Sequence, residues 1–135
     1  MPQRLMVHDV DPIADLLAKA GTLSEIEVPV NSVLVAIYKR PAQTKSGIIM
    51  PDQHRDEDKY QGKVGLVLKK GPLAFVDDDR YSFHGFAADR GEWVAYRVSD
   101  GFPLGIMGLD GKAVDCRLIK DSDIKLKIDQ PDIIY

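Results

Sequence analysis

The side chains most able to do chemistry in this chain are three histidines and one cysteine. His8, His54 and His84 are far apart, and none lies three to five residues from a second histidine or a cysteine. Zinc sites draw on ligand pairs at such short spacings, so we expect surface histidines and no metal centre. Cys116 alternates with Val114 and Leu118, which predicts an inert thiol packed on the apolar face of a strand.

Acidic residues are the other candidates for a catalytic or metal-binding role. The triplet Asp77 to Asp79 lacks the D-x-D-x-D-G spacing that wraps calcium, and it predicts a solvated turn. Asp121 and Asp123 flank Ser122, without the G-x-S-x-G pattern of a nucleophile elbow and without a paired-carboxylate arrangement. The sequence therefore predicts a protein that is not an enzyme and holds no cofactor.

Composition limits the kind of molecule. With 135 residues, 44% of them hydrophobic, the chain can bury one core but not two. The net charge of -3 comes without a basic stripe, which argues against nucleic-acid binding. No apolar run reaches the roughly 20 residues that span a bilayer, and the N-terminus lacks a secretory apolar region. A single cysteine excludes an internal disulfide and suits a reducing compartment.

One helix and then strands are expected along the chain. Asp11 is a suitable N-cap, Pro12 fits the first helical position and Gly21 a stop, which predicts a short amphipathic helix over Pro12–Ala20. From Val33 onward apolar residues recur with a period of two, which is typical of strands. The expected strands are Val33–Tyr38, Val64–Leu68, Glu92–Val98, Leu104–Met107, Ala113–Ile119 and Ile124–Ile128. Leu109-Asp110-Gly111 is the expected hairpin connection.

The segment Thr44–Pro51, TKSGIIMP, is the most informative stretch. It sets three consecutive apolar residues between turn formers, and a charge-dense run that cannot be buried cheaply follows. Taken alone, the segment fits a short core strand better than a docking sequence.

Its surroundings resemble the GroES co-chaperonin family, over about Val30 to Ile128. The matching positions are Thr44, Lys45, Gly47, Ile48, Ile49, Met50, Gly62, Val64, Gly71 and Pro72, while Ser46 replaces a family glycine. Downstream, Arg90–Tyr96, the turn Asp100-Gly101 and Cys116–Ile128 are similar to later family strands.

The resemblance implies an all-β fold, a small GroES-like β-barrel over residues 30–128 with a mobile loop at 42–61. Residues 1–29 would be an N-terminal extension with an extra short helix, and residues 129–135 a C-terminal tail. The helix is either a flap on the barrel or an added contact between subunits or with another protein. Residues 73–89 would replace the family's roof hairpin, with their aromatic residues forming a satellite core or a subunit contact.

The function implied is that of a co-chaperonin, a cytoplasmic homo-oligomeric ring that caps an ATP-loaded, GroEL-like chaperonin and assists protein folding. Rings in that family are usually heptamers, and ATP is bound by the chaperonin. The implied partner-binding residues are Gly47, Ile48, Ile49 and Met50. The first strand of one subunit would pair with the last strand of its neighbour, which implies an interface at Val33, Val35, Ile37, Ile124, Leu126 and Ile128.

An alternative of another class stays open. Bacteriophages encode diverged relatives of co-chaperonins, so the chain is also compatible with a virion structural protein that uses the same barrel to contact a viral capsid protein. The barrel also occurs in zinc alcohol dehydrogenases, but this chain lacks their G-x-G-x-x-G segment and their zinc ligands.

Overall fold

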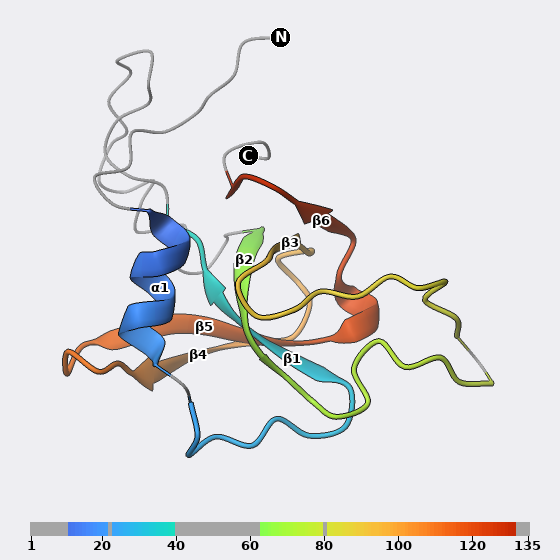
Figure 1. Ribbon diagram of the computed structural model, residues 1–135, viewed down its shortest axis with the longest axis horizontal. Helices are drawn as coiled ribbons and strands as arrows, with labels where there is room; N and C mark the ends of the chain where they lie inside the picture. The colour runs from blue at the N-terminus through green and yellow to red at the C-terminus, as the bar shows by residue number, and fades with distance from the viewer. Residues whose placement is uncertain (1–10, 22, 40–62, 80, 132–135) are drawn as a thin grey trace, which may run out of the picture.

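The computed structural model of the protein describes residues 11–21, 23–39, 63–79 and 81–131 (Figure 1). It is mostly β, with one six-stranded antiparallel sheet in the order β4-β5-β1-β2-β3-β6. The elements are α1 (Pro12–Ala20), β1 (Ser32–Ile37), β2 (Val64–Lys70), β3 (Trp93–Ala95), β4 (Phe102–Met107), β5 (Ala113–Lys120), the 3₁₀ turn η1 (Asp121–Asp123) and β6 (Leu126–Ile128). Within the described ranges, no helix is long and apolar enough to cross a membrane.

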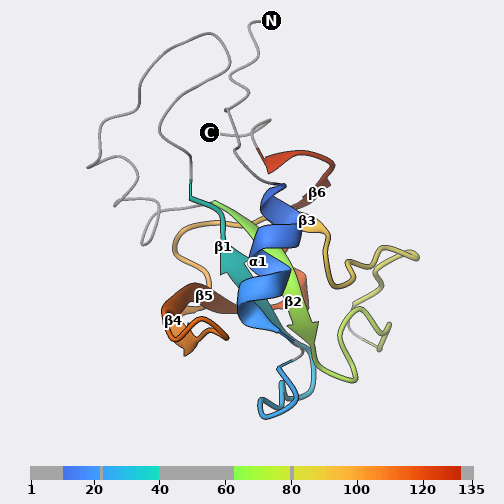
Figure 2. The ribbon, with the colours of Figure 1, turned by 60° about the vertical axis from the view of Figure 1, so that its left-hand side comes forward.

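Helix α1 has the predicted bounds because its two ends are capped as the sequence indicates. The Asp11 carboxylate accepts a hydrogen bond from the Ile13 N–H at 3.1 Å. Gly21, with φ of 73°, donates its N–H to the Leu17 carbonyl at 2.9 Å. The apolar side of α1, including Leu16, packs on the sheet, and the helix lies over β1 and β2 in Figure 2. The helix therefore covers a face of its own subunit.

Both faces of the sheet are buried along its central strands β1, β2 and β3. Along β1 and just beyond it, Leu34, Ala36 and Tyr38 enter one apolar cluster, which includes residues of α1 and of all six strands. Val33 and Val35 enter a second cluster on the other face. Residues 73–89 contribute to that second cluster and lie on the side of the sheet away from α1 (Figure 1).

The strand predictions are close to the observed elements, and β3 and β6 are shorter than expected. Beyond β3 the Tyr96 N–H still reaches the Lys63 carbonyl at 2.9 Å, but the Asp100 N–H then bonds to the Arg97 carbonyl at 3.0 Å and the chain turns. The hairpin between β4 and β5 closes as predicted, with the Gly111 N–H on the Gly108 carbonyl at 3.1 Å. Among the described residues the outer strands β4 and β6 are not paired with each other.

Candidate interaction surfaces

The segment that carries the apolar triplet begins and ends on neighbouring strands at the centre of the sheet. The last described residue before it, Lys39, follows β1, and the first one after it, Lys63, precedes β2. The antiparallel pairing of β1 and β2 continues to this point, because the Tyr38 N–H donates to the Val64 carbonyl at 2.9 Å. The two ends of the segment are therefore held about one strand spacing apart, roughly 5 Å.

Two side-chain contacts and one backbone hydrogen bond brace this base. The buried Tyr38 ring meets the buried Trp93 ring edge to face, with centroids 5.4 Å apart. The Lys39 ammonium pairs with the Asp115 carboxylate of β5. On the other strand, the Lys63 carbonyl accepts the Tyr96 N–H at 2.9 Å. The predicted partner-binding residues Gly47, Ile48, Ile49 and Met50 lie outside the described residues.

The three predicted interface residues on β1 lie in the interior of the chain. Val33 and Val35 are 0% exposed and Ile37 is 3% exposed. Strand β1 pairs with β2 on one edge and with β5 on the other. Its backbone groups are thus taken up within the subunit, and the described strand has no free edge for a neighbour.

The three predicted interface residues near the C-terminus are placed differently. Ile124 packs partly against the second cluster and Ile128 partly against the first. Leu126 is 52% exposed, and it belongs to β6, the last strand in the sheet order, whose described pairing is with β3 alone. Of the six predicted residues, Leu126 is thus the one that offers apolar surface on an edge strand.

The aromatic residues of segment 73–89 form a satellite cluster. Phe75 meets Phe83 and Phe86 with centroid distances of 5.6 and 6.0 Å, and Tyr81 meets Phe83 at 4.6 Å. Each pair is tilted toward the edge-to-face arrangement that aromatic rings favour. The half-buried Phe75 ring also packs on the second core cluster, so these rings extend the core outward.

The acidic triplet lies at the exposed turn of the same segment. Asp77 accepts the Phe83 N–H at 2.6 Å, and Asp78 accepts the Tyr81 N–H at 2.8 Å. These carboxylates satisfy backbone donors that the turn leaves open, which agrees with the predicted solvated turn.

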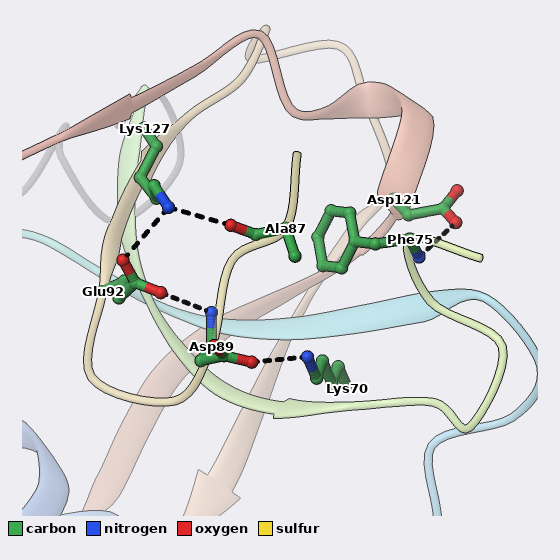
Figure 3. Close-up of polar contacts among 7 residues, drawn as sticks. All are labelled: Lys70, Phe75, Ala87, Asp89, Glu92, Asp121 and Lys127. Atoms are coloured by element: carbon green, nitrogen blue, oxygen red, sulfur yellow. Dashed lines mark hydrogen bonds and ion pairs between the residues drawn. The ribbon is translucent and has the colours of Figure 1, made fainter. Parts of the chain in front are cut away.

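Ion pairs and backbone bonds fix the segment to the sheet (Figure 3). The Lys127 ammonium of β6 lies 3.4 Å from the Glu92 carboxylate and donates to the Ala87 carbonyl at 3.0 Å. The other oxygen of Glu92 accepts the Asp89 N–H at 2.8 Å, and the Asp89 carboxylate pairs with Lys70 of β2 at 2.5 Å. The hydrogen bond and positive charge of Lys70 lower the pKa of Asp89 below its ordinary value.

A buried carboxylate, Asp121, anchors the start of the segment, and sequence reasoning did not single it out as structural. It accepts the Phe75 N–H at 3.0 Å (Figure 3), the Ser122 N–H at 2.7 Å and the Asn31 amide at 3.4 Å. The structural role of Asp121 could have been predicted from the sequence Asp-Ser-Asp, which follows an apolar strand directly. Such a position is typical of residues that cap backbone donors.

A second buried charge, Arg117, was also missed. Its guanidinium donates to the Val98 and Asp100 carbonyls at 2.9 and 2.6 Å and lies 5.9 Å from the centroid of the Tyr96 ring. An arginine in an apolar strand must find such partners when it is buried, and this side chain holds the turn that precedes β4.

Of the histidines and the cysteine considered for catalysis, Cys116 and His84 lie within the described part of the chain. Cys116 is buried and its thiol donates to the Val114 carbonyl at 3.4 Å. Burial, with a smaller contribution from the negative charge of Asp115, raises the pKa of the thiol to about 12. His84 is exposed, whereas His8 and His54 lie outside the described residues. Among the residues that the structure describes, no three His, Cys, Asp or Glu side chains gather to hold a metal ion.

Comparison with known protein families and with curated proteins found no match to this chain.

Proposed function

We propose that this protein is a co-chaperonin that caps an ATP-loaded chaperonin ring through the segment carrying Ile48, Ile49 and Met50. The structural observation that supports this function is the base of that segment, whose two ends leave the neighbouring central strands β1 and β2, which are buried on both faces. Such a base presents a partner-binding sequence from a fixed point while the sheet keeps its own core.

The energetics favour a ring over a single subunit. Burying three apolar side chains stabilises a complex by about 1.5 to 3 kcal/mol each, while ordering a loop costs about 1 to 2 kcal/mol per residue. One contact is therefore weak. Several contacts on one ring act together through effective concentration and give a reversible lid. In this proposal the chain forms a sevenfold GroES-like ring and β6, with Leu126 exposed, contributes to the contact between subunits.

The test is ATP-dependent binding to a GroEL-like chaperonin. We expect wild-type protein to be retained by immobilised chaperonin with ATP and lost without it. Ile49→Asp should abolish retention because a charge would enter a dry groove. The matched control is Gln53→Asp, which adds the same charge to the same segment outside the triplet and should keep binding.

Thermal unfolding of both variants separates a docking role from a core role. A docking triplet predicts that Ile49→Asp unfolds at nearly the wild-type temperature. A much lower temperature would mean that the triplet belongs to the core. Failure of the wild type to bind chaperonin in any nucleotide state would count against the co-chaperonin and favour attachment to a viral shell as the next assay.

A further inference from the structure

Strand β4 is an edge strand without a charged residue. Its sequence is FPLGIM, and the uncharged stretch extends from Gly101 to Leu109. Phe102 is 53% exposed and Met107 is 72% exposed. Its described pairing is with β5 alone, and it stands first in the sheet order. Edge strands are commonly protected by charged residues or by proline; β4 has no charge, and its one such device is Pro103.

The hydrogen-bonding groups on the free side of β4 can be assigned from the hairpin. The Gly108 N–H donates to the Lys112 carbonyl across to β5 at 2.8 Å. Backbone groups alternate in direction along an antiparallel strand, so Pro103, Gly105 and Met107 direct theirs away from β5. Pro103 thereby places its missing N–H on the free side. Gly105 and Met107 keep both donor and acceptor there.

The uncharged edge of β4 and its outward-directed backbone groups are complementary to the same strand of a second copy of this chain. An antiparallel pairing about a two-fold axis, with Gly105 opposite Met107 of the other copy, exchanges backbone bonds at both positions. A strand paired with itself in this way brings its own charges near one another, and β4 carries none.

The side chains are complementary in the same register. Opposite residues of an antiparallel pair point to the same face, so each Met107 would extend over the Gly105 of the other copy. A Cβ built on Gly105 has Ala113 Cβ as its nearest neighbour, at 3.8 Å, so that position is open. The exposed Met107 side chain thus meets the position of β4 that has room for it.

We propose that the β4 edge is a two-fold interface at which two copies of this chain join their sheets. This inference does not rest on the chaperonin role, because it uses the strand opposite to β6 in the sheet order.

Light scattering on size-exclusion fractions tests the interface. We expect Met107→Lys to halve the mass of the wild-type particle, since it places a charge in the middle of the pairing. Gly105→Val should have the same effect, because it fills the space for Met107 while raising the strand propensity. The control is Val76→Lys, which replaces a side chain 51% exposed on segment 73–89 and should leave the mass unchanged.

Equal masses for wild type, Met107→Lys and Gly105→Val would overturn the proposal, and so would a wild type that is monomeric up to millimolar concentration. Circular dichroism and unfolding temperature establish that both β4 variants remain folded. A loss of mass shared by Val76→Lys would also contradict it, because the effect would then not belong to β4.

Discussion

At the scale of single residues, the buried charges that the structure describes, Asp121 and Arg117, bind backbone groups. Asp121 collects donors from three segments, and Arg117 holds the two carbonyls of the turn before β4. Cys116 and Tyr96 are buried as well, and the Tyr96 hydroxyl has no hydrogen-bond partner among the described residues. Burial raises the pKa of Tyr96 above its ordinary value of 10.0. Both groups therefore resist ionisation in the folded state.

Cys116 makes stability dependent on alkaline pH. The pKa of its thiol rises from an ordinary 9.0 to about 12 on folding, so above pH 9 the unfolded chain loses a proton that the folded chain keeps. The free energy of unfolding should then fall by about 1.4 kcal/mol per pH unit from this group alone. It should be unaffected by this group below pH 9. Urea unfolding between pH 8 and pH 10 measures the slope.

Cys116→Ala is the matched variant for that measurement. The substitution lowers stability at every pH by removing buried volume, and it should also flatten the slope above pH 9. Parallel slopes for wild type and variant would show that Cys116 does not carry the effect. Native protein at pH 8 should also react with thiol reagents far more slowly than protein in urea.

At the scale of elements, tight turns set where strands begin. Gly101 precedes β4 with φ of 66°, and a Cβ there would lie 2.0 Å from the Leu118 carbonyl oxygen. Gly111 in the β4 and β5 hairpin has φ of 80°, but nothing lies within 4 Å of its Cβ position. The two glycines share a conformation and differ in the space around them.

Alanine substitutions at Gly101 and Gly111 should therefore differ in their cost to stability. Gly111→Ala should cost about 1 to 2 kcal/mol, the strain of a left-handed conformation. Gly101→Ala should cost at least twice as much, since the backbone of β5 must also move. Urea midpoints at one pH measure both values. Equal losses would indicate that the turn before β4 shifts freely and that Arg117 does not hold it.

The elements themselves were predictable from local patterns, but their neighbours were not. Asp11, Pro12 and Gly21 define α1 because capping acts within a few residues. The alternation of apolar and polar residues located the strands because it, too, is a pattern within a few residues. The placement of β1 between β2 and β5 depends on a partner about 80 residues away, so local patterns did not show that the strand expected at a subunit interface from the family resemblance is central in its own sheet. The burial of Asp121 likewise depends on contacts with Asn31 and Phe75.

At the scale of the whole molecule, the two proposed contacts lie on the two outer strands of the sheet. In the proposed ring, β6 joins neighbouring subunits, whereas β4 joins two copies about a two-fold axis. If both proposed contacts form, the 15.0 kDa chain would assemble into paired rings. Disabling one contact at a time therefore leaves a different particle in each case.

Leu126→Lys, Met107→Lys and the double variant test this arrangement by mass. We expect paired rings for wild type, single rings for Met107→Lys, dimers for Leu126→Lys and monomers for the double variant, since each lysine adds a charge to one edge. Light scattering gives the four masses. If Leu126→Lys kept the full wild-type mass, the ring contact would lie elsewhere than on β6.

The base of residues 40–62 has a consequence for how this protein can change over time. Its two ends are held on paired strands, so if the segment has the proposed docking role, altering its length changes the entropy of closing it by about 0.6 kcal/mol for each doubling. Under that proposal, insertions, deletions and new recognition sequences would be nearly neutral for folding. A segment that selects a partner in this way could diverge quickly in a lineage while the sheet beneath it stays the same.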